Sequence, residues 1–350
     1  MANVKNILVT IPAEPAHAER LQAAAPGCEL RFRQAMALPS GERAKLPFAS
    51  LLEAPPVTQE DVDWADVILG NVKGAMLHGS EKLQWLQTNS AGVEEYIKPG
   101  VLASNTQLTN ATGAYGLAIS EHMLGMLLEI FKKLELYRDA QHKEAWESLG
   151  AVRSIYGSTV LVLGMGDIGG EFGIRCKALG AKVLGVRRTD AQKPDYADEV
   201  HLIDELDQLL PQADVVAVTL PGTEATRNLL DRRRIGLMKP GAVLLNVGRG
   251  YIVDTEALCD ALESGALSGA GVDVTEPEPL PAGHRLWQLP TAVVTPHISG
   301  FYHLKETHER IVGIMAENLE RFLAGQPLRN QVDFSTGYRQ RTVANVTLAP

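Results

Sequence analysis

The sequence has few cysteines, no long apolar run and no excess of positive charge. Its three cysteines, Cys28, Cys176 and Cys259, are far apart and odd in number. This suits neither a disulfide framework nor a zinc knuckle, so we expect ordinary reduced thiols. No apolar run approaches the roughly 20 residues that cross a bilayer, and the first strand-like segment, residues 4–11, begins too early for a signal peptide. These absences predict a soluble, cytoplasmic protein with no membrane partner.

The balance of charge argues against a nucleic-acid partner. The chain carries 33 Lys and Arg against 42 Asp and Glu, for a formal charge of −9. Neutralising a phosphate backbone needs a cationic face, which this composition does not provide. At roughly 150 residues per domain, the 350 residues suggest two globular domains.

Short apolar runs alternate with helical patterns along the whole chain. This alternation favours an α/β fold of parallel sheets covered by helices, here as two doubly wound domains. Four strands are predicted in the first third of the chain, at residues 7–11, 29–33, 66–70 and 84–88. Six more follow in the last two thirds, a number typical of a nucleotide-binding sheet. They are residues 159–163, 182–186, 214–220, 242–247, 269–274 and 292–295.

Two helices and two irregular segments complete this organisation. A helical apolar spacing predicts one long helix over residues 117–136, and another over 308–324 that ends before Gly325. The run of small residues at 110–116 is typical either of a crossing between domains or of a plain loop. Residues 39–57 show no clean period and are predicted to form an irregular loop.

A glycine motif follows the first strand of the second series directly. It reads Gly-Met-Gly-Asp-Ile-Gly over residues 164–169, and a helical pattern opens at once. The strand, glycines and helix in this order are the context that dinucleotide binding requires, because the glycines permit a tight turn and a close approach of the pyrophosphate. A turn without a ligand is the alternative. Coenzyme contacts are expected at Gly164, Gly166, Asp167, Ile168 and Gly169.

The next strand ends in Arg187, Arg188 and Thr189. An NAD site places a carboxylate here on the ribose 2′-hydroxyl, whereas two guanidiniums and a hydroxyl would bind a 2′-phosphate. The sequence therefore predicts NADP(H) as the preferred coenzyme, with NAD(H) possible if these arginines are merely a solvated strand end.

Three charged residues, Arg249, Glu278 and His297, lie just beyond predicted strand ends, where α/β sheets place their ligands. Taken singly, each has an ordinary structural interpretation: a turn guanidinium, a solvated loop acid and a structural imidazole. Their order behind the glycine motif resembles the D-isomer-specific 2-hydroxyacid dehydrogenase family. The resemblance covers most of residues 60–333 and includes the segments 85–93, 220–223 and 318–322.

The resemblance implies a role for each of the three residues. Arg249 would clamp the substrate carboxylate and polarise the adjacent carbonyl. His297 would be the general acid that protonates the developing alkoxide, and the base in the reverse direction. Glu278 would hydrogen-bond the imidazole and favour its protonated form. No metal is needed for this chemistry, and no cluster with metal-ligand spacing is present.

Further contacts are implied position by position. Asp273 resembles the residue that meets the nicotinamide carboxamide. Neighbours of the nicotinamide ribose would be Leu220, Pro221, Val247 and Gly248. The substrate loops, whose backbone amides would receive the carboxylate, would contain Asn71, Val72, Lys73, Ser90, Ala91 and Gly92. For Lys73 itself a solvent-facing lysine is the simpler interpretation.

In this family a Rossmann coenzyme domain is inserted into a smaller, flavodoxin-like substrate domain. The resemblance thus implies a substrate domain over residues 1–109 and 298–350, with the coenzyme domain over 110–297 and His297 at the cleft between them. The helix at 117–136 would pack against a second copy in a two-fold homodimer.

The implied activity is NADPH-dependent reduction of a small 2-oxo acid to the D-2-hydroxy acid. Two alternatives stay open at this point. One is a glyoxylate or hydroxypyruvate reductase specifically. The other is a non-catalytic protein that binds NADP(H) as a sensor and presents a surface to protein partners.

Overall fold

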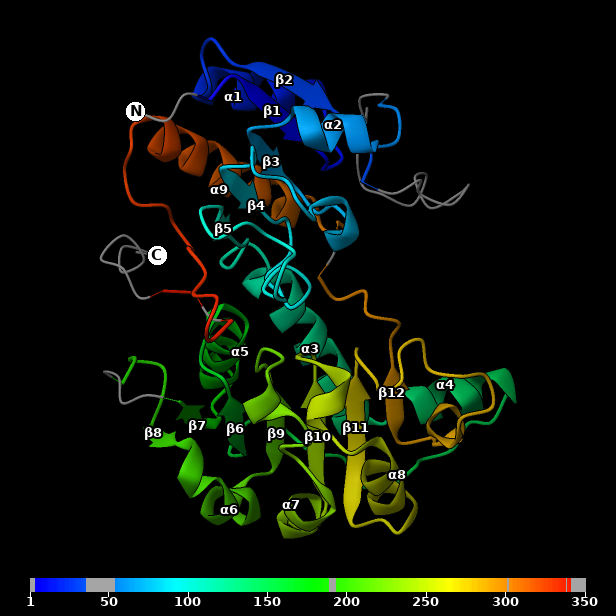
Figure 1. Ribbon diagram of the computed structural model, residues 1–350. Coiled ribbons are helices and arrows are strands. Elements are labelled where there is room, and N and C mark those ends of the chain that lie inside the picture. The colour runs from blue at the N-terminus through cyan, green and yellow to red at the C-terminus, as the bar shows by residue number, and fades with distance from the viewer. Residues whose placement is uncertain (1–3, 36–53, 189–192, 301, 338, 341–350) are drawn as a thin grey trace. The chain divides into compact units, whose positions relative to one another are not determined.

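The computed structural model describes residues 4–35, 54–188, 193–300, 302–337 and 339–340 (Figure 1). The chain divides into two compact units: unit 1 holds Met1–Tyr115 and Phe301–Pro350, and unit 2 holds residues 116–300. The chain thus leaves unit 1 after residue 115 and returns to it after residue 300, whereas the predicted coenzyme domain spans residues 110–297. Most of the predicted loop at 39–57 lies outside the described residues. None of the described helices is long and apolar enough to span a bilayer.

Unit 1 is built on a five-stranded parallel sheet with the order β2-β1-β3-β4-β5. This is the flavodoxin-like order of a doubly wound sheet. Its strands are β1 (Asn6–Val9), β2 (Glu29–Phe32), β3 (Val67–Leu69), β4 (Trp85–Gln87) and β5 (Gln107–Thr109). Its helices are α1 (Pro15–Ala24), α2 (Gln59–Trp64) and α9 (Lys305–Leu323). The sequence did not predict β5, whose three residues Gln-Leu-Thr contain a single apolar side chain.

Unit 2 is built on a seven-stranded parallel sheet with the order β12-β11-β10-β9-β6-β7-β8. Numbered within the unit this is 3-2-1-4-5-6-7, the Rossmann order with one strand added, so the order reverses between β6 and β9. The strands are β6 (Thr159–Leu163), β7 (Lys182–Arg187), β8 (Glu199–Leu202), β9 (Val215–Val218), β10 (Ala242–Asn246), β11 (Leu267–Val272) and β12 (Ala292–Val294). The helices are α3 (Gly116–Lys132), α4 (Leu134–His142), α5 (Asp167–Ala178), α6 (Leu206–Leu209), α7 (Arg232–Leu237) and α8 (Thr255–Glu263). Strand β8 was missed by the prediction of six.

The long helix predicted at 117–136 is wrong in one respect, because it breaks at Lys133. That residue adopts a left-handed conformation, with φ 57°, between α3 and α4. The chain returns to the break at residues 149–153: Lys132 Nζ donates to the Arg153 carbonyl, and Lys133 Nζ to the Leu149 carbonyl. These tertiary contacts leave no trace in the apolar spacing, which continues across the break.

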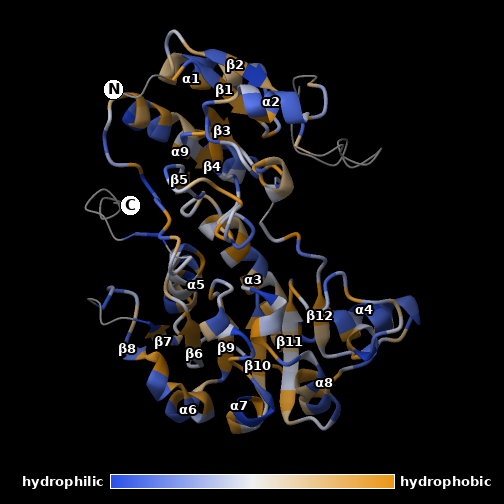
Figure 2. Cartoon of the chain, in the orientation of Figure 1, coloured by the Kyte–Doolittle hydropathy of each residue, from blue (hydrophilic) through white to orange (hydrophobic). Residues whose placement is uncertain are grey.

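The core of unit 2 lies around its central strands, which are apolar and buried. Figure 2 shows apolar colour along β6 and β10, whereas α7 and α8 carry both apolar and polar residues. On β11, a Cβ at Gly269 would lie 2.4 Å from Ile130 Cγ2, and one at Gly271 would lie 3.0 Å from Met126 Cβ. Helix α3 therefore packs on β11 at a distance that only glycine permits. Helix α3 is therefore closely packed against β11, the strand that directly precedes Asp273.

Candidate active site

Three adjacent strands of unit 2 end at one level. The register pairs Asn246 of β10 with Val272 of β11, and Val272 with Val294 of β12. Because carboxyl ends of parallel strands form one edge, the residues that follow these strands are neighbours. Arg249, Asp273 and His297 each follow one of the three strands within a few residues. The fold thus brings the ends that carry these predicted residues to one edge of the sheet.

Glu278 and His297 form a hydrogen-bonded pair. The two residues are 19 apart in sequence, and His297 Nδ1 lies 2.6 Å from Glu278 Oε1. Since a carboxylate can only accept, the proton of this bond is on Nδ1. The other ring nitrogen, Nε2, is then the atom with which His297 can exchange a proton with a bound molecule. Both side chains are about half exposed, at 49% and 43%.

Arg249 lies on a turn that Asn246 holds. The Asn246 side chain accepts from the Gly248 N–H at 3.1 Å and donates to the Arg249 carbonyl at 3.1 Å. Arg249 Nη1 donates to the Gly248 carbonyl at 2.8 Å. Sequence reasoning did not include Asn246 in the site. Its position as the last residue of a buried apolar strand was the signal that could have pointed to it.

The glycine motif forms the turn that its spacing predicts. Gly164 follows β6 with φ +96°, and Thr219 Oγ1 donates to its carbonyl at 2.6 Å. A Cβ at Gly169 would lie 2.0 Å from the Gly164 carbonyl oxygen, so only glycine lets α5 begin here. At Gly166, the residue before α5, no atom lies within 4 Å of the place of a Cβ. A ligand can therefore approach the backbone at the N-terminus of α5, next to Asp167 and Ile168.

The predicted ribose neighbours surround the same turn. A Cβ on Gly164 would lie 3.1 Å from Leu220 Cδ2, and a Cβ on Gly248 would lie 2.6 Å from the Leu220 carbonyl oxygen. The loops after β6, β9 and β10 are thus in contact, with Pro221 and Val247 next in sequence. The Asp167 carboxylate accepts from the Gly116 N–H at 2.9 Å, which ties the start of α5 to the start of α3.

Arg187 at the end of β7 is half-buried, and Arg188 after it is exposed. Burial raises the pKa of Tyr196, although the nearby Arg187 guanidinium opposes the shift. The Tyr196 ring lies against Gly170 and Gly173 of α5. Within the described part of the chain, Arg187 Nε is buried without a hydrogen-bond partner. Sequence reasoning missed Tyr196, and the predicted contact Thr189 lies outside the described residues.

The predicted substrate loops of unit 1 follow the adjacent strands β3 and β4. Two asparagines join them: Asn71 N–H donates to Asn89 Oδ1 at 2.8 Å, and Asn89 N–H to Asn71 Oδ1 at 3.1 Å. Asn71 Nδ2 also donates to Ser90 Oγ at 3.2 Å. Of the other predicted residues, Lys73 and Ala91 are exposed, Gly92 is half-buried and the Val72 side chain is buried. The structure thus brings Asn71 and Ser90 together within unit 1.

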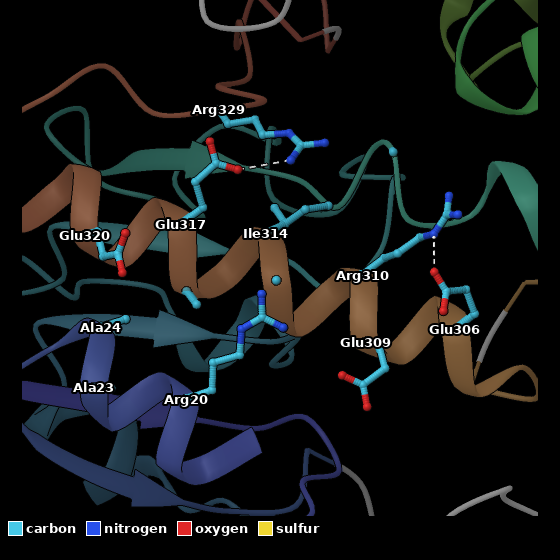
Figure 3. Close-up of a pocket in the computed structure, with 13 residues that line it drawn as sticks. Arg20, Ala23, Ala24, Glu306, Glu309, Arg310, Ile314, Glu317, Glu320 and Arg329 are labelled. Atoms are coloured by element: carbon cyan, nitrogen blue, oxygen red, sulfur yellow. Dashed lines mark hydrogen bonds and ion pairs between the residues drawn. The ribbon is translucent and has the colours of Figure 1, made fainter. Parts of the chain in front are cut away.

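A groove of about 700 Å³ lies elsewhere in unit 1, between α1 and α9 (Figure 3). Its walls are charged, and their charges are largely satisfied by one another. Arg310 pairs with Glu306 at 3.0 Å, and Arg329 pairs with Glu317 at 3.1 Å. None of the predicted site residues lines it, so we assign it no ligand.

One group of metal-ligand type occurs among the described residues, formed by Glu14, His17 and Glu309. The Glu14 N–H donates to His17 Nδ1 at 3.2 Å, so the ring proton is on Nε2, which donates to Glu309 at 3.0 Å. Both ring nitrogens are used in this way. The group is therefore a hydrogen-bonded link between α1 and α9.

Known proteins are similar to this chain both in overall fold and in the sequence of unit 2. The family described as "D-isomer specific 2-hydroxyacid dehydrogenase, NAD binding domain" matches residues 124–299. A glyoxylate reductase of Korarchaeum cryptofilum is 32% identical over 247 residues, which are 69% of this chain and 72% of that protein.

Two solved structures extend the likeness over nearly the whole chain. A family protein from Aeromonas salmonicida has a TM-score of 0.77 and 32% identity, covering 95% of this chain and 100% of that one. A D-isomer specific 2-hydroxyacid dehydrogenase from Xanthobacter autotrophicus, in complex with NADPH and MES, has a TM-score of 0.77 and 25% identity, covering 96% and 100%. The chain belongs to the D-isomer specific 2-hydroxyacid dehydrogenase family of oxidoreductases, which act on small 2-hydroxy and 2-oxo acids with a nicotinamide coenzyme.

Proposed function

We propose that this protein reduces a small 2-oxo acid to the D-2-hydroxy acid with NADPH. The observation that carries the proposal is the Glu278–His297 pair, 2.6 Å apart, at the carboxyl edge of the sheet that also bears the glycine turn. The K. cryptofilum relative is named a glyoxylate reductase, which favours a substrate of this size. Glyoxylate and hydroxypyruvate are therefore the first candidates.

The residues around the glycine turn fit a dinucleotide. The open space at Gly166 and the amides of the first turn of α5 suit a pyrophosphate. When bound, the coenzyme supplies the hydride. Leu220, Pro221, Val247 and Gly248 would lie along its ribose.

The protein's own side chains supply the rest of the chemistry. The Arg249 guanidinium would hold the substrate carboxylate and polarise the neighbouring carbonyl. His297 would donate the proton from Nε2 to the developing alkoxide, while Glu278 fixes the ring and stabilises its charged form. In unit 1, the backbone amides of residues 72–73 and 90–92 are proposed to bind the carboxylate as well, while the Asn71 amide is taken up by Asn89.

A preference for NADP(H) rests on Arg187 and Arg188. The buried Arg187 Nε without a described partner is a donor that a 2′-phosphate could satisfy, and the X. autotrophicus relative was crystallised with NADPH. Charge-assisted hydrogen bonds are worth about 1.5–3 kcal/mol, so replacing both arginines by Gln should lower the NADPH-to-NADH ratio of kcat/KM about tenfold or more. An unchanged ratio would place the 2′-phosphate elsewhere.

A homodimer through α3 and α4 is part of the same proposal. Leu134 at the start of α4 is 53% exposed, and Trp146 shortly after α4 is fully exposed. Large apolar side chains in this state are typical of surfaces that a partner covers. Light scattering of the purified protein should give twice the chain mass, and Trp146→Lys should reduce it.

The decisive experiment is a substrate panel with NADPH and NADH. It should include glyoxylate, pyruvate, hydroxypyruvate, and branched and aromatic 2-oxo acids. NADPH oxidation with at least one of them, faster than NADH oxidation, is expected. His297→Ala should lose turnover and still bind NADPH. No turnover across the panel, with NADPH binding retained, would replace the enzyme proposal by a nucleotide-sensing protein.

A further inference from the structure

The loop that carries His297 has a conformation that needs outside support. We refer to residues 295–299, which follow β12, as the His297 loop. His297 has φ +54°, in the left-handed region that few residues other than glycine adopt. Its N–H donates to the Asp273 carbonyl at 2.8 Å and to the Thr295 carbonyl at 3.1 Å. A backbone of this kind persists only where its surroundings determine it.

Asp273 supplies that support from both sides of His297. Its carboxylate is 1% exposed. Oδ1 accepts from Thr295 Oγ1 at 2.6 Å and from the Ile298 N–H at 2.9 Å. Oδ2 accepts from the Ser299 N–H at 3.1 Å and from Ser299 Oγ at 2.5 Å. A carboxylate has about four acceptor positions, so the loop occupies all of them.

His122 completes this chain of hydrogen bonds from α3. Its Nε2 lies 3.0 Å from Thr295 Oγ1. Because the threonine proton is donated to the Asp273 carboxylate, Oγ1 accepts from His122, whose proton is therefore on Nε2. The direction of donation is thus His122 to Thr295 to Asp273. Since α3 packs on β11 through Gly269 and Gly271, His122 joins the loop to a rigid part of unit 2.

We propose that His122, Thr295 and Asp273 are positioning residues that hold the His297 loop in its reactive conformation. Asp273 then acts through the loop, and this role adds to the contact with the nicotinamide carboxamide that the family resemblance implies. The proposal rests on the proposed acid and base role of His297. It separates two quantities at Thr295 and His122: loss of either link lowers kcat and leaves the affinity for the coenzyme unchanged.

The test compares variants that break the chain with variants that keep its donors. Thr295→Val and His122→Leu remove a link, whereas Thr295→Ser keeps the hydroxyl and His122→Gln keeps a donor. Misplacing a reacting group by about 1 Å can cost about a hundredfold in rate. We expect the first two variants to lose about ten- to hundredfold in kcat, with the Kd for NADPH within about twofold. The two conservative variants should recover most of the rate.

Matched controls make the outcomes distinct. His142→Leu, at an exposed histidine of α4, should leave kcat unchanged, and thermal melting of each variant reports its folding. If His297→Ala is inactive while Thr295→Val keeps the full kcat, the positioning proposal is overturned although the proposed function stands. If Asp273→Asn raises the Kd for NADPH and leaves kcat at saturation intact, Asp273 is a coenzyme ligand and the proposal fails. If His297→Ala is fully active, the proposed function itself fails.

Discussion

His308 should make the stability of unit 1 depend on pH. This histidine of α9 is fully buried, with its ring edge-on to His17 at 4.5 Å between centroids and to Tyr302 at 5.2 Å. Burial, and then the proximity of His17, lower its pKa to about 4, although the Pro12 carbonyl and the carboxylates of Glu309 and Glu14 oppose the shift. His308 is therefore neutral in the folded protein at pH 5.

The size of the effect follows from linkage. In the unfolded chain His308 regains the ordinary histidine pKa of about 6.5, so the unfolded state binds a proton that the folded state does not. Stability is thus unaffected above about pH 6.5 and is lost as the pH falls towards 4. Between pH 7 and pH 5 the loss from this group is about 2 kcal/mol, and at still lower pH it approaches about 3 kcal/mol.

Urea unfolding at pH 7, 6 and 5 tests this reasoning. Replacing Trp146 and Trp287 of unit 2 by Phe leaves Trp64 and Trp85 to report on unit 1. In that background His308→Phe, which keeps a ring and removes the titration, should flatten the decline by about 2 kcal/mol. Substituting the exposed His142 by Gln should not. A His308→Phe variant that declines as steeply as the parent would refute the assigned cause.

Three further substitutions probe the site and the core. Glu278→Gln should lower kcat about tenfold or more, because it removes the charge that stabilises the imidazolium, and steady-state kinetics with the best 2-oxo acid measure this. Tyr196→Phe removes the hydroxyl near the Arg187 guanidinium; it should raise KM for NADPH about three- to tenfold and leave KM for NADH unchanged. Equal changes for both coenzymes would contradict this link. Phe172→Ala in α5, where the side chain is fully buried, should cost about 3–5 kcal/mol in urea unfolding.

Most strands were predictable because apolar residues follow one another along the sequence, whereas polar residues interrupt the strands that were missed. The predicted sheet of six strands in unit 2 lacked only β8, whose four residues Glu-Val-His-Leu are exposed or half-buried and mix charge with apolar character. The three residues of β5, Gln-Leu-Thr, contain one apolar side chain, whereas the equally short β3, Val-Ile-Leu, is wholly apolar and was predicted. The break at Lys133 depends on contacts with residues 149–153, and a periodic apolar spacing contains no information about such contacts.

For the site, the sequence located charged residues and missed their supports. Glu278 and His297 were expected to pair, and their atoms are 2.6 Å apart. Tyr196 and His122 gave no signal, and Asn246 gave only its place at the end of a buried apolar strand. His122 acts through a partner that is distant in sequence. His122 and Thr295 are 173 residues apart. Only the register of β11 and β12 and the packing of α3 bring such a pair together.

The sheet order explains why proton donation and coenzyme binding can be fixed relative to each other. The glycine turn follows β6, the ribose neighbours follow β9 and β10, and the His297 loop follows β12, all in one continuous parallel sheet. Hydrogen bonds between adjacent strands fix these positions, and the His122 to Asp273 chain fixes the last loop. Under the proposed function, the positions of the proposed proton donor and coenzyme contacts within unit 2 are therefore set by folding and need little further ordering when a substrate binds. Variants that loosen the His297 loop should consequently lower kcat before they alter coenzyme binding.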